Sequence, residues 1–261
     1  MRIACIGDNT IDYYDAAGKG SPGGNSVNVA VYLRRLGVDS SYIGAVGSDA
    51  YGQIVFNALK EKEVDVSRVR VLKGNTAVCH VSIENGERSF GKYDEGVLAD
   101  FRPDEEDISF LLEHDLVVTA VWGHSETVLR EIWRHHIPTA FDASNELSHP
   151  AALTALPFST AFFFSDDISS DDIVKDKLRS LQAHGPEIVI AMRGEKGSIA
   201  FDGSTFYEYG TVQCEVVDTN GAGDSYIAGF LKAWLEKMNV EECMYEGAKN
   251  ASVTICYSGA W

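Results

Sequence analysis

The sequence predicts an α/β fold: a central, mostly parallel β-sheet flanked by helices, with a small β-sheet that covers it as a lid. Short runs rich in β-branched and aromatic residues recur between helical patterns, at residues 3–6, 41–46, 116–122, 139–141, 161–164 and 188–192. Several of these runs are apolar throughout, which is typical of strands buried on both faces of a parallel sheet. Two other stretches do not follow this rhythm, which favours a second, smaller sheet.

The helices between the strands each carry one apolar stripe. In the first, Val29, Tyr32, Leu33 and Leu36 recur at the spacing of one helix face, and Gly37 follows as a stop signal. A later helix repeats the pattern with Ile227, Phe230, Leu231, Trp234 and Leu235. Both helices are therefore expected to pack one face against the sheet.

The lid strands are expected from about residues 10–20 and 76–93. Within the second stretch apolar and polar residues alternate from Ala77 to Ile83, and Asn85-Gly86 is a strong signal for a hairpin turn. A lid over the main layer and an ordinary edge hairpin explain this pattern equally well.

Composition sets the class of protein. The 261 residues include 22 Lys and Arg against 39 Asp and Glu, which gives a formal charge of −17. This acidic balance argues against nucleic acid or an anionic membrane as a partner, because both need a basic surface.

With no linker or repeat, we expect one domain over residues 1–261. Five scattered cysteines and an N-terminal strand in place of an apolar signal segment predict a cytoplasmic protein with free thiols.

The segment DTNGAGD, residues 218–224, is the most informative motif. It follows an expected β-run at residues 211–217 and opens a helix, so the backbone N–H groups of Gly221, Ala222 and Gly223 are predicted to bind an anion. Asp224 would repel that anion, and we interpret it as the base that takes the proton from an attacking hydroxyl. The alternative is a helix cap, which does not explain the second glycine or Asp218.

Two weaker motifs indicate ligand contacts. Gly23 and Gly24 let a small polar ligand approach the main chain, and Asn28, with Asp12 upstream, suits a polyhydroxylated molecule. A plain loop before a helix is the alternative. The turn Gly194-Glu195-Lys196-Gly197 follows a buried strand, where α/β sheets bind nucleotides, although a hairpin turn explains it nearly as well.

These motifs, in this order, resemble the ribokinase family of sugar kinases, of the phosphofructokinase-B type. The resemblance also includes YIGAVGSDAYG at residues 42–52 and covers essentially the whole chain, whereas the P-loop and the protein-kinase triplets are absent. It implies a ribokinase-like fold with a lid over the sugar, and ATP with Mg²⁺ as the phosphoryl donor.

The resemblance also assigns residues to roles. Asp224 becomes the catalytic base and Gly221, Ala222 and Gly223 the anion hole. Asp12, Gly23, Gly24 and Asn28 would hold sugar hydroxyls, while Gly194, Gly197 and Thr219 would lie along the nucleotide.

The chain departs from the family at its metal motif. The family often carries N-x-x-E, linked to Mg²⁺ and phosphate, but the equivalent stretch here is Ser165-Asp166-Asp167-Ile168. Either aspartate could substitute, or the run, with Asp171-Asp172 after it, is a solvated helix start. The metal ligands are therefore left unassigned.

Within the family, segments outside the general signature are most similar to kinases of fructosamines. They lie at residues 7–14, 23–32, 90–101, 121–126, 139–144 and 258–261. A sugar with an amino-acid appendage carries a cationic amine and a carboxylate, for which Arg88, Asp94, Glu95 and His124 are candidates. Surface charge is the alternative for these four residues.

The predicted function is ATP-dependent phosphorylation of a primary hydroxyl of a ketose-like sugar, above all O6 of a fructosamine such as fructoselysine. A fructokinase or ribokinase-like enzyme is the first alternative, and a sugar- or nucleotide-binding regulator without turnover is the second. The expected partner is a small sugar or glycated amino acid, and two copies could pair through the lid.

Overall fold

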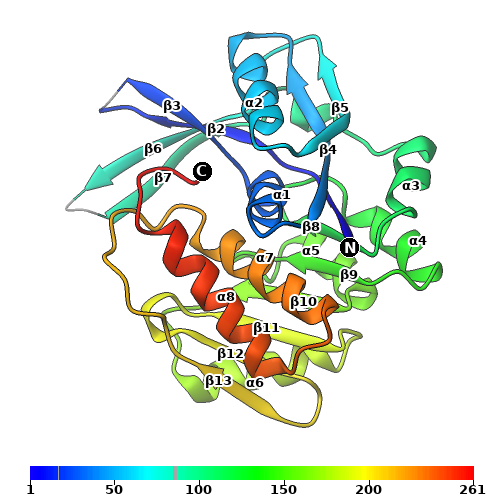
Figure 1. Ribbon diagram of the computed structural model, residues 1–261, viewed down its shortest axis with the longest axis vertical. Coiled ribbons are helices and arrows are strands. Elements are labelled where there is room, and N and C mark those ends of the chain that lie inside the picture. The colour runs from blue at the N-terminus through cyan, green and yellow to red at the C-terminus, as the bar shows by residue number, and fades with distance from the viewer. Residues whose placement is uncertain (17, 85–86) are drawn as a thin grey trace.

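The computed structural model describes residues 1–16, 18–84 and 87–261, without the side chains of residues 83–90. Its main sheet has the strand order β13-β12-β11-β10-β9-β8-β1-β4-β5, and its small sheet the order β3-β2-β6-β7 (Figure 1). The strands are β1 Arg2–Ile6, β2 Thr10–Tyr14, β3 Lys19–Gly23, β4 Asp39–Gly47, β5 Asp65–Leu72, β6 Val78–Glu84, β7 Glu87–Asp94, β8 Leu116–Ala120, β9 Thr139–Asp142, β10 Ala161–Ser165, β11 Ile188–Met192, β12 Ser198–Phe201 and β13 Phe206–Tyr209. The α-helices are α1 Asn25–Arg35, α2 Ala50–Glu61, α3 Glu105–Leu111, α4 Leu129–Arg134, α5 Pro150–Ala155, α6 Asp171–Gln182, α7 Ala222–Leu235 and α8 Val240–Thr254.

The main sheet is parallel from β11 to β5, and only β12 and β13 pair antiparallel at its edge. Successive side chains of β1 show that both faces are buried: Ile3 and Cys5 pack with α1, α2, α7 and α8, whereas Ala4 and Ile6 pack with α3 to α6. The prediction of a mostly parallel sheet between two helical layers is confirmed.

The small sheet projects from one end of the main sheet (Figure 1). Its strands β2 and β6 pair parallel, and each has an antiparallel neighbour, β3 and β7. The expected turn at Asn85-Gly86 lies outside the described residues. Helix α1 ends as expected, with Leu36 at its C-cap and Gly37 at φ 79°.

Two strand predictions were wrong: one expected strand is absent and another is shorter than expected. Residues 211–217 form no strand, although Val216 and Val217 have β-forming side chains. Both valines are about 60% exposed, and the segment contacts the end of α8 through the bond from Val217 N to Ile255 O (2.8 Å) rather than pairing with a strand. Strand β8 ends at Ala120, so Val121 and Trp122 lie beyond it.

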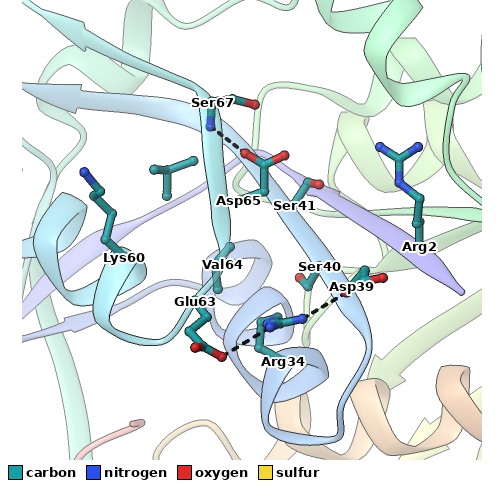
Figure 2. Close-up of a pocket in the computed structure, with 11 residues that line it drawn as sticks. Arg2, Arg34, Asp39, Ser40, Ser41, Lys60, Glu63, Val64, Asp65 and Ser67 are labelled. Atoms are coloured by element: carbon teal, nitrogen blue, oxygen red, sulfur yellow. Dashed lines mark hydrogen bonds and ion pairs between the residues drawn. The ribbon is translucent and has the colours of Figure 1, made fainter.

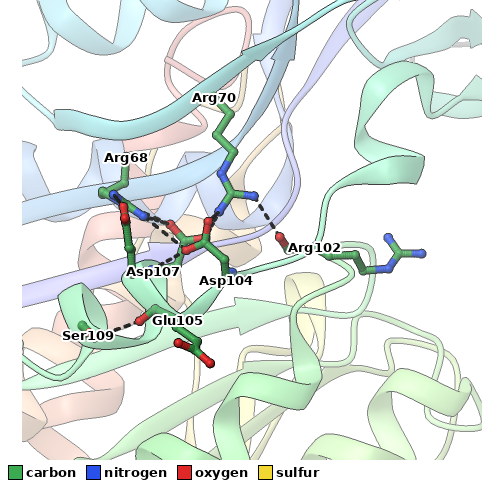
Figure 3. A network of polar contacts seen from close by, with 8 residues as sticks. Arg68, Arg70, Arg102, Asp104, Glu105, Asp107 and Ser109 are labelled. Atoms are coloured by element: carbon green, nitrogen blue, oxygen red, sulfur yellow. Dashed lines mark hydrogen bonds and ion pairs between the residues drawn. The ribbon is translucent and has the colours of Figure 1, made fainter.

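An ion-pair network joins edge strand β5 to α3 (Figure 3). Arg68 and Arg70 converge on Asp107, whose side chain is fully buried and also accepts the N–H of Asp104 (3.0 Å) in a capping box. The exposed Glu106 adds a pair with Arg68 (2.9 Å). The network therefore holds the exposed edge of the sheet to a helix that is only seven residues long.

A hollow of about 500 Å³ lies at the amino ends of β4 and β5 (Figure 2). Three of its charged side chains form ion pairs, since Arg34 contacts both Asp39 (3.1 Å) and Glu63 (3.2 Å). The opposite edge of the sheet, where the strands end, holds the motif residues described below.

Two further features concern the expected class of protein. Among the described residues, no helix is both long and apolar enough to cross a membrane. All five cysteines are free thiols, as expected.

We predict that Asp107→Ala lowers the free energy of unfolding by about 2 kcal/mol or more, because it leaves two arginines without their buried partner. Urea denaturation at neutral pH measures the change. Glu106→Ala is the matched control: it removes an exposed pair from the same network and should cost no more than about 0.5 kcal/mol. Equal losses in the two variants would contradict this account.

Candidate active site

The sequence motifs meet at the carboxyl edge of the main sheet, where open α/β sheets bind their ligands. Asp8 follows β1, Asp142 ends β9, and Asp224 lies in the first turn of α7. The backbone is tightly packed here, because a Cβ on Gly7 would lie only 2.8 Å from Gly123 Cα. The site therefore lies where the carboxyl ends of β1 and β9 meet the first turns of α1 and α7.

Asp224 is buried, with 8% of its surface exposed, and its Oδ2 accepts a hydrogen bond from Asn28 Nδ2 (2.8 Å). It does not cap α7, whose N-cap is Gly221 without a side-chain bond. Burial raises the pKa of Asp224 well above its ordinary value, the charge of Asp142 raises it further, and the bond from Asn28 opposes both. A buried carboxyl group with a raised pKa has the properties of a general base.

The turn before Asp224 presents backbone N–H groups. Gly221 has φ 73°, and a Cβ there would lie 2.1 Å from the Tyr32 hydroxyl, so only glycine fits. The N–H of Ala222 donates to Thr219 O (3.2 Å). Within the described residues the N–H groups of Gly221 and Gly223 have no protein acceptor. Two of the three predicted anion donors are thus free to bind a ligand.

Asp8 holds the start of α1. Its carboxylate accepts from Asn25 N (2.6 Å), Ser26 N (3.1 Å) and Ser26 Oγ (2.8 Å). Asp8 therefore accepts the hydrogen bonds that an N-cap side chain would accept in α1, because the N-cap residue of this helix, Gly24, has no side chain. Gly24 has φ 115° and lies against Asn9, where a Cβ would approach Asn9 Cα to 2.7 Å. Sequence reasoning missed Asp8, because nothing in the local pattern links it to a helix 17 residues later.

Asp142 is a second carboxylate that sequence reasoning missed. It is 4% exposed and accepts from Asn25 Nδ2 (2.8 Å) and Ser144 N (2.9 Å). Burial raises its pKa to about 6, and the charge of Asp8 contributes. In the part of the chain that the structure describes, no Lys, Arg or His forms an ion pair with Asp8, Asp142 or Asp224.

The small sheet contributes Asp12 and Gly23 to the same place. Asp12 lies on β2, and its Oδ2 accepts from Asn220 Nδ2 (3.1 Å) in the DTNGAGD turn. A Cβ on Gly23 would lie 2.4 Å from Asp12 Oδ2, so the glycine leaves room for that carboxylate. The structure thus brings Asp12, Gly23 and Asn220 together at the turn that leads to Asp224.

Two of the residues predicted to lie along the nucleotide, Gly194 and Gly197, are at a different part of this edge, whereas Thr219 lies in the DTNGAGD turn, where its carbonyl accepts the N–H of Ala222 (3.2 Å). Gly194 and Gly197 belong to the turn between β11 and β12, and Thr219 is exposed. Gly197 has φ 80° and would place a Cβ 2.1 Å from Tyr209 O, so strand packing alone requires glycine there. A hollow of about 300 Å³ next to the turn is lined by Asp171, Arg193, Lys196, Ser198, Ile199, Glu208, Tyr209 and Gly210.

Two aspartates of the acidic run after β10, Asp166 and Asp171, have protein partners. Asp166 accepts from Lys177 Nζ (2.6 Å) and Ser169 N (2.9 Å), and these bonds lower its pKa to about 2 despite partial burial. Asp171 pairs with Arg193 (2.6 Å). In residues 1–16, 18–84 and 87–261, no group of three acidic, histidine or cysteine side chains could hold a metal ion.

Two of the four residues considered for the appendage lie together. Glu95 Oε2 is 3.3 Å from His124 Nε2, both side chains are about one third exposed, and His124 has φ 49°. Asp94 instead accepts the N–H of Gly96 (3.1 Å). Arg88 is in β7, but its side chain lies outside the described residues.

Residues 3–261 match the family described as pfkB family carbohydrate kinase. The chain is 40% identical over 259 residues to fructoselysine 6-kinase of Escherichia coli K12, with 99% of both chains covered. It is 33% identical over 265 residues to fructosamine kinase FrlD of Bacillus subtilis strain 168, covering 100% of this chain and 93% of that one.

Solved structures agree on the fold. Arabidopsis thaliana ribokinase, in complex with ribose and ATP, superposes with a TM-score of 0.88 at 20% identity, covering 99% of this chain and 93% of that chain. Thermotoga maritima ribokinase gives a TM-score of 0.82 at 19% identity, with 100% and 94% covered. The predicted ribokinase-like fold is confirmed. The family match over nearly the whole length shows that this chain is a carbohydrate kinase of the pfkB family.

Proposed function

We propose that this kinase transfers the γ-phosphoryl group of ATP to O6 of a fructosamine such as fructoselysine, with Asp224 as the base. The observation that carries the proposal is the position of Asp224: a buried carboxylate, held by Asn28, one residue after a turn with two free N–H groups. The names of the relatives at 40% and 33% identity supply the substrate class.

The reaction needs a base and an anion site close together. The acceptor hydroxyl loses its proton to Asp224 as its oxygen bonds to the γ-phosphorus, and the bond from that phosphorus to the bridging oxygen of ADP breaks. The N–H groups of Gly221 and Gly223 donate to the phosphoryl oxygens, where negative charge is spread in the transition state. Asn28 Nδ2 donates a hydrogen bond to Oδ2 of Asp224, so Oδ1 is the oxygen that remains to receive the proton.

We propose that Mg²⁺ enters with ATP. Because the described residues form no cage of three metal-binding side chains, the ion would be held by the phosphates and few protein groups, as is usual for Mg²⁺ at phosphate sites. Gly194, Gly197 and Thr219 remain our candidates along the nucleotide, and Asp12, Gly23 and Gly24 along the sugar, beneath the small sheet as a lid.

The charge of the site favours a cationic substrate over a plain ketose. Asp8, Asp142 and Asp224 are buried with neutral hydrogen-bond donors, so a nearby cation would stabilise them. The amine of a fructosamine is such a cation, whereas fructose and ribose are neutral. Glu95, paired with His124 at the surface, is our candidate for contact with the charged appendage, and Arg88 is a candidate for its carboxylate.

We also propose a cellular location and a mode of self-association. ATP and free thiols fit a cytoplasmic enzyme, and two copies would pair through the small sheet. A plain fructokinase is the alternative that the substrate test below separates. A regulator without turnover is disfavoured, because a carboxylate beside an anion site weakens binding of the nucleotide, whereas phosphoryl transfer needs a base there.

We expect Asp224→Asn to lower kcat by 10² or more, because the amide cannot accept the proton, while sugar and ATP still bind. ADP release measures turnover, and calorimetry measures binding. The neighbouring Asp218→Asn is the comparison, since Asp218 accepts backbone N–H groups of Asn220 (2.9 Å) and Gly259 (2.8 Å). Undiminished turnover in Asp224→Asn would remove the base from this mechanism.

We expect Glu95→Gln to raise KM for fructoselysine severalfold and to leave KM for fructose, if it is a substrate, unchanged. Only the glycated substrate carries a positive charge for the carboxylate to bind. Asp94→Asn is the matched control, because Asp94 is adjacent but accepts a backbone N–H. Equal changes in KM for fructoselysine and for fructose would show that Glu95 does not contact the amino-acid appendage.

We expect the difference in unfolding free energy between wild type and Asp142→Asn to depend on pH. The pKa of Asp142 is raised in the folded protein to about 6, so its favourable contribution is complete below about pH 4 and is lost as pH rises through 6. A shift of about two units makes wild type lose roughly 3 kcal/mol relative to the variant over this range. Urea titrations at several pH values measure it.

Asp176→Asn, on the exposed face of α6, controls for the loss of one negative charge. A pH-independent difference between wild type and Asp142→Asn would contradict the raised pKa of Asp142.

A further inference from the structure

A chain of two hydrogen bonds connects Trp261 to Asp224. The indole Nε1–H of Trp261 donates to Asn28 Oδ1 (2.7 Å), and Asn28 Nδ2 donates to Asp224 Oδ2 (2.8 Å). Asn28 is 3% exposed, so water does not readily replace either partner. From these contacts we propose that Trp261 is a positioning residue, which acts on Asp224 by fixing the orientation of the Asn28 amide.

The chemistry of the three groups sets this orientation. An indole N–H can only donate a hydrogen bond, so it must face the oxygen of the Asn28 amide. The NH₂ group then faces Asp224, where it stabilises the carboxylate. A flipped amide would place its oxygen against the carboxylate, which is repulsive, and would leave the indole without an acceptor. Trp261 thus excludes the amide orientation that would turn the oxygen toward the base.

The segment that carries Trp261 is fixed by contacts of its own. Ala260 is fully buried and its carbonyl accepts the hydroxyl of Tyr32 (2.5 Å), while Gly259 N donates to Asp218 Oδ2 (2.8 Å). Asp218 begins the DTNGAGD turn, and Tyr32 lies against Gly221 of the same turn. The residues next to Trp261 are therefore held to the two ends of the turn that precedes the base.

This arrangement changes the role expected for Asn28. Its amide uses one N–H for Asp224 and one lone pair of its oxygen for Trp261, which leaves one N–H and one lone pair for a sugar hydroxyl. Asn28 therefore links the base to the sugar site, and its geometry depends on Trp261. The inference rests on the proposed role of Asp224 as the base.

The test is Trp261→Phe, which keeps an aromatic ring and removes the N–H. We expect kcat to fall roughly tenfold, in keeping with the loss of one hydrogen bond next to a charged group, while KM for ATP changes less than twofold. The acidic limb of the pH profile of kcat should move to higher pH, because Asp224 is less well stabilised as a carboxylate among Asp8, Asp12 and Asp142. A purely structural role would not move that limb.

Two controls make the result decisive. Tyr257→Phe removes a hydroxyl that also bonds Ala260 O (3.2 Å) but does not touch Asn28, so its kcat and pH profile should match wild type. In an Asn28→Ala background, Trp261→Phe should cause no further loss of kcat, because the group it positions is gone. Thermal unfolding of each variant confirms that it is folded.

The outcomes separate this inference from the proposed function. An unchanged kcat and pH profile in Trp261→Phe, or a full additional loss in the Asn28→Ala background, would overturn the positioning role even if Asp224→Asn is inactive. If Asp224→Asn keeps its turnover, the proposed base fails first, and this inference fails with it.

Discussion

The first turn of α1 is the feature on which the site depends, because it gathers carboxylates from three separate parts of the fold. Asn25 and Ser26 bind Asp8 after β1, the side chain of Asn25 binds Asp142 at the end of β9, and Asn28 binds Asp224 at the start of α7. All of these donors are neutral. The helix can therefore hold the carboxylates in place without neutralising them, which keeps the pKa values of Asp142 and Asp224 raised.

This arrangement costs stability and prepares the site for a ligand. Buried carboxylates without cations destabilise a folded protein when they are ionised, and hydrogen bonds from amides offset only part of the cost. A cation that binds here recovers part of that free energy, whereas a neutral sugar does not. The same raised pKa makes Asp224 a stronger acceptor of a proton than an exposed aspartate. In the proposed function, affinity for a charged substrate and the role of Asp224 as a base would thus have one electrostatic origin.

Sequence patterns were informative where local chemistry decides the structure. Uniformly apolar runs located the parallel strands, and the DTNGAGD motif located Gly221 and Asp224 because a turn and a helix start are local features. The contacts of Asp8, Asp142 and Trp261 were missed, since they join segments far apart in the chain: 233 residues separate Asn28 from Trp261. The strand expected at residues 211–217 is absent: among the described residues this segment pairs with no strand, and Val217 N donates to Ile255 O at the end of α8 instead.

The two edges of the main sheet differ in how their charged and polar groups are paired, and this difference favours the carboxyl edge as the proposed active site. At the amino edge, Arg34 contacts Asp39 and Glu63, so two acidic groups of that hollow already have a cationic partner within the protein. At the carboxyl edge, the described residues leave Asp8 and Asp142 with neutral partners and leave free N–H groups at Gly221 and Gly223. The proposed substrates, a cationic glycated amine beside anionic ATP, would satisfy both sets of groups and would recover part of the free energy that the unpaired carboxylates cost.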